Sequence, residues 1–151
     1  MPDRTVLISS GCICCGKSYL LKRLLKWPEL SAAVSFHLDP LRIALYGKRA
    51  DTHVTKTEHV FKNEWMRNEM LRALVLGARL VASEVVMLTR SAHQQPMAEM
   101  VARAECYIQA IESEGCARDG KPPPTIPSRV RLKVILCYAS LECISKRLAG
   151  D

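Results

Sequence analysis

The sequence predicts an α/β fold in which helices cover both faces of a parallel sheet. Short apolar segments typical of strands alternate with longer segments whose apolar residues recur at helical spacing, which is the pattern of a parallel α/β sheet. The strand segments are near-continuous apolar runs, as expected when both faces of a sheet are buried. The 151 residues are the length of one domain, so we expect a single domain over residues 1–151.

The first half of the chain predicts two strands and two helices. Residues 5–9 are apolar and β-rich and predict a buried strand, and residues 18–27 have leucines at helical spacing until Pro28 ends the helix. Residues 33–38 predict a second strand, and residues 56–76 predict a long helix. On or near the apolar face of that long helix we expect Val60, Trp65, Met66, Met70, Leu71 and Leu74.

The second half predicts two more strands and two more helices. Residues 79–87 and 131–138 are apolar strand segments, and residues 91–114 have helical character. A Pro-rich, polar stretch at residues 115–129 predicts an exposed loop. A short final helix is expected to begin at Ser140.

Composition excludes some classes of protein. No apolar run reaches the length of a membrane-spanning helix, and the N-terminal apolar run is too short for a signal peptide. We therefore expect a cytoplasmic protein without a membrane partner. Seven cysteines are an odd number for a disulfide framework and are expected to be reduced thiols. The net charge of +7 favours anionic partners such as nucleotides or nucleic acid, or is simply a solvated basic surface.

The stretch GCICCGKS matches the phosphate-binding pattern G-x-x-x-x-G-K-[ST] in full. An apolar strand precedes it and an amphipathic helix follows, so the N–H groups of the loop and the helix dipole can bind a phosphate. Lys17 would neutralise the β- and γ-phosphates of ATP, and Ser18 would bind Mg²⁺. The predicted nucleotide-binding residues are Gly11, Cys12, Ile13, Cys14, Cys15, Gly16, Lys17, Ser18 and Tyr19.

Three cysteines fill this loop. The phosphate contacts come from the backbone, so the side chains of the central positions are free to vary. A thiol at a helix N-terminus beside Lys17 is expected to be reactive, and we hypothesise that Cys14 or Cys15 is sensitive to oxidation and shielded by nucleotide. A metal site is the alternative, but Cys12, Cys14 and Cys15 are too close together for the usual zinc spacing. The histidines show no ligand spacing and are interpreted as surface or strand residues: His37, His53, His59 and His93.

Acidic and basic residues follow the second strand. Asp39 comes after the strand at residues 33–38, and Arg42 follows it by about one helical turn. Ligands of open α/β sheets bind outside the carboxyl ends of the strands. Asp39 could accept or orient the proton of an attacking hydroxyl, and Arg42 could bind an anionic part of the acceptor. The alternative is that Asp39 caps the next helix, with Pro40 at its first position.

Three further residues are candidates for the site. Glu84 ends an apolar strand, where an acid on the Mg²⁺ side would hold a metal-bound water. The alternative for Glu84 is a carboxylate that faces solvent. Arg90 could reach phosphate from the loop that follows. Arg147, in the last helix, could stabilise charge on the transferred phosphoryl group, or could be a surface residue.

Four segments together resemble the P-loop kinase-like proteins grouped as AAA-type ATP-binding domains, which include zeta-toxin-like kinases, polynucleotide kinase domains and adenylate-kinase-like small kinases. The segments are VLISSGCICCGKSYLLKRL, HLDPLR, VASEVVMLTRSAHQQPM and VRLKVILCYASLECISKRLAG. The resemblance implies a three-layer P-loop NTPase fold with strand order 2-3-1-4-5. It implies transfer of the ATP γ-phosphate to a hydroxyl or phosphate, with catalytic roles for Lys17, Asp39, Arg42 and Arg147.

The sequence departs from this family at three places. The loop lacks an inner glycine, Glu84 stands where an Asp is expected, and a lid and fifth strand are expected to be missing. Two alternatives stay open beside a small kinase. One is a nucleotide-binding pseudo-kinase or regulatory module without efficient turnover. The other is a kinase of nucleic-acid ends, for which a basic groove would use Arg42, Lys48, Arg49 and Lys56.

Overall fold

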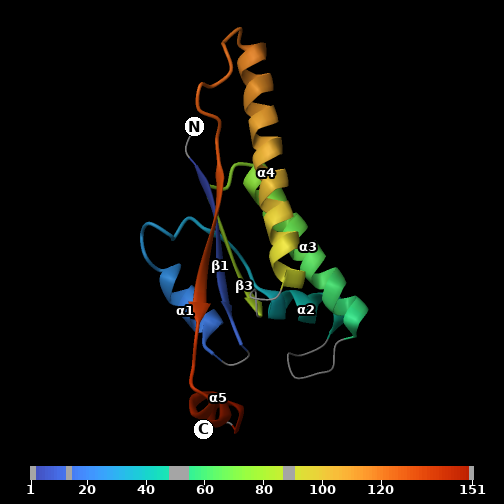
Figure 1. The fold of residues 1–151 in the computed structure, drawn as a ribbon, viewed down its shortest axis with the longest axis vertical. Coiled ribbons are helices and arrows are strands. Elements are labelled where there is room, and N and C mark those ends of the chain that lie inside the picture. The colour runs from blue at the N-terminus through green and yellow to red at the C-terminus, as the bar shows by residue number, and fades with distance from the viewer. Residues whose placement is uncertain (1–2, 13–14, 48–54, 87–90, 150–151) are drawn as a thin grey trace.

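The computed structural model describes residues 3–12, 15–47, 55–86 and 91–149. Strands and helices alternate along the chain as predicted, except between the second and third strands, where two helices follow each other (Figure 1). The elements are β1 (Arg4–Gly11), α1 (Lys17–Leu24), β2 (Val34–Phe36), α2 (Leu38–Tyr46), α3 (Lys56–Val75), β3 (Leu80–Val86), α4 (Ser91–Arg118), β4 (Val130–Cys137) and α5 (Leu141–Ala149).

The four strands form one parallel sheet in the order β2-β3-β1-β4. The central strand β1 pairs with β3 and β4, and its last residue, Gly11, lies opposite Val86 and Cys137. The carboxyl ends of these three strands are therefore level with one another. This order is that of the first four strands in the arrangement implied by the resemblance.

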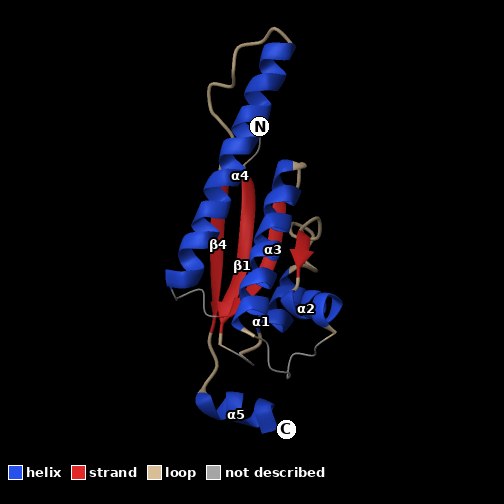
Figure 2. Ribbon diagram, turned by 90° about the vertical axis from the view of Figure 1, so that its right-hand side faces the viewer, coloured by secondary structure: helices blue, strands red, loops and turns tan. Residues whose placement is uncertain are grey.

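Helices lie on both faces of the sheet. The long helices α3 and α4 cover one face and α1 lies on the other (Figures 1 and 2). The larger core fills the α3 and α4 side, with Val6, Ile8, Met70, Leu74 and Val81 fully buried. A smaller core under α1 contains Leu7, Leu21 and Ala82. The second core is smaller because α1 has only 8 residues, whereas α3 has 20 and α4 has 28.

The predicted apolar face of α3 was wrong at two positions. Val60 and Trp65 are 54% and 38% exposed, while Met66, Met70 and Leu74 are buried. The buried residues repeat every four positions, which keeps them on one narrow stripe of the helix. Trp65 falls outside that stripe, and Val60 belongs to the early turns of α3, ahead of the buried stripe.

Strand β4 corrects the prediction that every strand is covered on both faces. It is an edge strand, and Leu132, Val134 and Leu136 are exposed. Helix α4 contacts the beginning of β4, where Val130 is buried and its N–H donates to Glu105 at 2.9 Å. Apolar residues along an edge strand keep high β propensity without being covered, so the run of apolar letters did not distinguish the two cases.

Several boundaries also differ from the prediction. Helix α4 continues to Arg118, so residues 115–118 are helical rather than part of the exposed loop. Within the remaining loop Ser128 is buried, and its hydroxyl donates to Glu112 at 2.5 Å. The start of α5 is confirmed, because the Ser140 hydroxyl accepts from the Cys143 N–H at 3.2 Å. Among the described residues, no helix combines the length and apolarity that a membrane span requires.

Candidate functional site

Two glycines shape the loop between β1 and α1. Gly16 is the N-cap of α1 and has a φ of 94°, a left-handed conformation that favours glycine. Gly11 ends β1, where a Cβ atom would lie 2.5 Å from the Cys15 sulfur and still closer to the carbonyl oxygen of Cys137. A side chain at position 11 would therefore push the loop away from β4. Backbone conformation at Gly16 and lack of space at Gly11 therefore explain why the motif has glycine at both positions.

Lys17 begins α1 and lies almost completely buried beneath the loop. Its ammonium group donates to the carbonyl oxygen of Cys12 and lies 3.9 Å from the sulfur of Cys15. The backbone carbonyl of Lys17 accepts from the Ser9 hydroxyl at 3.5 Å, which ties the start of α1 to β1. The positive charge is thus held inside the curve of the loop, next to the N-terminus of a helix.

Ser18, Glu84 and His37 form a line of polar contacts from three elements. The Ser18 hydroxyl donates to Oε2 of Glu84, although the two residues are 66 positions apart. The other oxygen, Oε1, lies 3.4 Å from Nδ1 of His37. Glu84 is buried on β3, and His37 directly follows β2. Glu84 therefore does not simply face solvent, which was one of its two predicted readings.

His37 was predicted to be a surface or strand residue and not part of the site. Its position near the end of the predicted strand, two residues before Asp39, was the available signal. His37 is also the N-cap of α2, which corrects the proposed capping by Asp39 with Pro40 at the first helical position. Asp39 lies instead in the first turn of α2 and is exposed at the carboxyl end of the sheet.

Arg147 reaches the loop from α5. It lines a cavity of about 500 Å³ together with Gly16, Lys17, Ser18 and Tyr19. Its Nη1 lies 3.6 Å from the position that a Cβ of Gly16 would occupy. The cavity therefore has two cations on its wall and the N-terminus of α1 at its base, which is an environment suited to an anion.

Other predicted site residues fall outside what the structure describes. Ile13, Cys14 and Arg90 are not among the described residues, and Arg42 is described only as a backbone position in α2. The basic residues Lys48 and Arg49 are likewise outside them.

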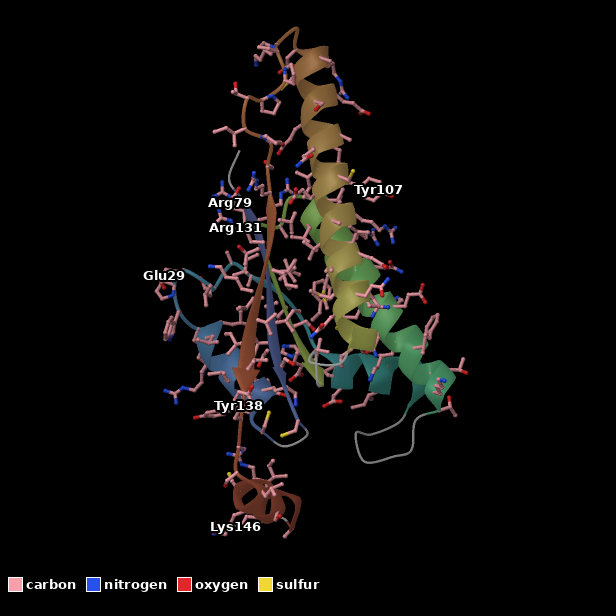
Figure 3. The ribbon with its side chains drawn as sticks, viewed as in Figure 1. Glu29, Arg79, Tyr107, Arg131, Tyr138 and Lys146 are labelled. Atoms are coloured by element: carbon pink, nitrogen blue, oxygen red, sulfur yellow. The ribbon has the colours of Figure 1, made fainter. Side chains whose placement is uncertain are left out.

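The exposed positive charge of the molecule is not confined to the loop end. Arg79 and Arg131 lie toward the amino end of the sheet, whereas Tyr138 lies at its carboxyl end (Figure 3). Arg131 pairs there with Asp3 at 2.5 Å. These two arginines therefore belong to the amino end of the sheet and not to the candidate site.

The oxygen atoms present fit a magnesium ion better than a zinc ion. Within the described ranges, no group of three or more His, Cys, Asp or Glu side chains is arranged to hold a metal. Magnesium keeps most of its water ligands and needs only one or two protein oxygens beside the phosphates. The Ser18 hydroxyl and the Glu84 carboxylate are already in contact and supply such oxygens.

Neither a protein-family model nor a curated protein matches the sequence. Solved structures do match it by fold. One is a chain of the Pnkp1/Rnl/Hen1 RNA repair complex, with 13% identity and a TM-score of 0.59. Another is an unliganded sugar kinase from Janibacter sp. HTCC2649, with 11% identity and a TM-score of 0.58. The match covers 99% of this chain in both cases, but only 38% of the first neighbour and 68% of the second.

These likenesses confirm the predicted fold class. The chain has an α/β, kinase-like P-loop fold in which a parallel four-stranded sheet carries the loop at the carboxyl end of its central strand. At such low identity the likeness establishes the fold and leaves substrate and partner to be inferred from the site.

Proposed function

We propose that this chain binds ATP with Mg²⁺ and transfers the γ-phosphoryl group to a hydroxyl or phosphate of an acceptor. The observation that carries the proposal is the contact of Ser18 with Glu84 beside the buried Lys17. A hydroxyl, a carboxylate and an ammonium group at a glycine loop are the parts that P-loop phosphoryl transfer requires. The parallel sheet brings them together at its carboxyl end, where ligands of such sheets bind.

Lys17 changes partner when nucleotide binds. Its ammonium donates to the Cys12 carbonyl, and phosphate oxygens offer a stronger, charge-assisted partner. Bound Mg²⁺ would supply neutralisation of phosphate charge. Ser18 and Glu84 would hold it, Ser18 directly and Glu84 through a water, and the contact between them keeps both oxygens on the same side of the loop.

Asp39 and Arg42 would serve the acceptor. Both lie on α2, which begins directly after His37. Asp39 orients the acceptor hydroxyl or accepts its proton, and Arg42 binds an anionic part of the acceptor. Arg147, which lines the cavity with Lys17 and Ser18, stabilises charge on the group in transfer. The named neighbours are a sugar kinase and a chain of an RNA repair complex, so acceptors to be tried first are sugars and nucleic-acid ends.

The first test is a titration with a fluorescent ATP analogue, with and without Mg²⁺. We expect Lys17→Ala to weaken binding by about tenfold to a hundredfold, the effect of losing a hydrogen bond to a charged group. The exposed Lys22 lies on the same helix, so Lys22→Ala is the matched control and should bind like the wild type. Absence of binding by a folded wild-type protein would refute the proposal.

A second test separates an enzyme from a nucleotide-binding regulatory module. Transfer of labelled γ-phosphate to sugars and to oligonucleotides with free hydroxyl ends is measured for the wild type and Asp39→Ala. An enzyme should lose transfer in Asp39→Ala and keep nucleotide affinity. Nucleotide binding without transfer to any acceptor would favour the regulatory module. Steep salt dependence of oligonucleotide binding would favour nucleic-acid ends as the acceptor.

A further inference from the structure

Cys15 and Cys137 both pack against Gly11 at the end of β1. A Cβ atom at Gly11 would lie 2.5 Å from the sulfur of Cys15 and 3.2 Å from Cβ of Cys137. Both cysteines are therefore packed around the same point at the end of β1. Gly11 and Cys137 are register partners in adjacent parallel strands, so the side chain of Cys137 and the missing side chain of Gly11 point to the same face of the sheet.

The two side chains are neighbours. The Cys15 sulfur and Cβ of Cys137 both lie within 3.2 Å of the position that a Cβ of Gly11 would occupy, and a disulfide forms when the Cβ atoms of two neighbouring cysteines come to about 3.5–4.5 Å. The sulfur of Cys137 lies 3.2 Å from the Ser9 hydroxyl, so joining it to Cys15 requires it to leave that contact by rotation about the Cα–Cβ bond. Glycine at position 11 leaves the space between the two thiols free of any side chain.

A small oxidant can approach Cys137. Cys15 and Cys137 are each 8% exposed, which keeps bulky reagents away. A cavity of about 180 Å³ is lined by Cys137, together with Gly11, Cys12 and Tyr138 among others. Its volume exceeds that of several water molecules, each of which occupies about 30 Å³, so hydrogen peroxide fits.

We propose that Cys15 and Cys137 are a modification site that hydrogen peroxide converts to an intramolecular disulfide. The Cys137 thiolate attacks one peroxide oxygen, breaks the O–O bond and forms a sulfenic acid, with hydroxide leaving as water after protonation. The Cys15 thiolate then attacks the Cys137 sulfur and expels the second hydroxide, which also leaves as water. Two thiols lose two electrons in total, and one peroxide is reduced to two waters.

The disulfide regulates the phosphate loop, and this part rests on the proposed function. Phosphate binding requires Lys17 to exchange its contact with the Cys12 carbonyl for phosphate oxygens. A bond from Cys15 to the end of β4 restrains Cys15, two residues before Lys17, and hinders that exchange. We expect nucleotide affinity to fall by about tenfold, a common size for coupling between two sites. By the same coupling, bound nucleotide should reduce formation of the disulfide.

The test treats purified, reduced wild-type protein with hydrogen peroxide and maps its peptides by mass spectrometry without reduction. We expect a Cys15–Cys137 cross-linked peptide, with the loss of two hydrogen atoms, that dithiothreitol removes. Cys15→Ser and Cys137→Ser should abolish it. Cys143→Ser, which changes a half-buried cysteine on α5, is the matched control and should leave it unchanged. Cross-links from Cys12 or Cys14 instead, or only sulfinic acid on single cysteines, would overturn the proposal.

Nucleotide titrations then separate this inference from the proposed function. Oxidised wild-type protein should bind the fluorescent ATP analogue about tenfold more weakly than reduced protein, and dithiothreitol should restore the affinity. Cys137→Ser should bind equally before and after peroxide. If the reduced protein does not bind the ATP analogue at all, the proposed function fails, while the mapped cross-link still decides whether the disulfide forms. A mapped cross-link without any change of affinity would refute the regulatory role.

Discussion

Replacement of Gly11 by alanine tests the packing at the base of the loop. The added methyl carbon would meet the Cys15 sulfur at 2.5 Å and the Cys137 carbonyl oxygen at a still shorter distance. The sulfur can rotate away, but the carbonyl belongs to the backbone of β4 and is held by its pairing with β1. Relief of the clash therefore requires the end of β4 or the loop to move.

The expected cost is that of overpacking a tight site. Such substitutions lower the free energy of unfolding by about 1–3 kcal/mol. A loss of about 2 kcal/mol lowers the urea midpoint of a small domain by about 1 M, given typical denaturant slopes. Because the displaced segment is the phosphate loop, affinity for the ATP analogue should fall as well.

Gly115→Ala is the matched control for this prediction. Gly115 lies within α4, and nothing is within 4 Å of the Cβ that alanine would add. Alanine is a better helix former than glycine by about 0.8–1 kcal/mol, so this variant should unfold at slightly higher urea. Unfolding of both variants is followed by circular dichroism. A Gly11→Ala protein with unchanged midpoint and unchanged nucleotide affinity would refute the geometry of the loop.

Three other predictions follow from the site and the core. His37→Leu should raise the Mg²⁺ concentration for half-maximal nucleotide binding about fivefold, because Glu84 loses a hydrogen bond worth about 1 kcal/mol. His37→Asn should keep the wild-type value, because its amide can donate from the Nδ1 position. Equal behaviour of the two variants would contradict the role of His37. Arg147→Ala should slow phosphoryl transfer about a hundredfold while affecting nucleotide affinity less, and equal loss of both would show that Arg147 acts in binding alone. Leu74→Ala should lower the free energy of unfolding by about 2–5 kcal/mol because Leu74 is fully buried, and Leu76→Ala, at a 76% exposed position, should stay within about 0.5 kcal/mol of the wild type in the same urea titration.

At the site, features that depend on consecutive residues were predicted correctly, and contacts between distant residues were not. The Gly11 to Ser18 motif placed the loop correctly between β1 and α1 because its geometry depends on consecutive residues. Glu84 was selected as a strand-end carboxylate, but its contacts with Ser18 and His37 join residues 66 and 47 positions away. His37 was missed because nothing near it in the sequence marks a partner on another strand.

The sequence by itself determined the order of the four strands and of every helix except α2, the length of α3 to within a residue and the loop that begins α1. These features depend on glycine, proline and the spacing of apolar residues, whose effects act over a few neighbouring positions. Only the tertiary structure decided that β4 is an exposed edge, that Val60 and Trp65 of α3 point away from the core, and that Cys15 and Cys137 both pack against Gly11. Each of these features depends on which distant segment packs against the residue, and the intrinsic propensity of a residue does not depend on that segment.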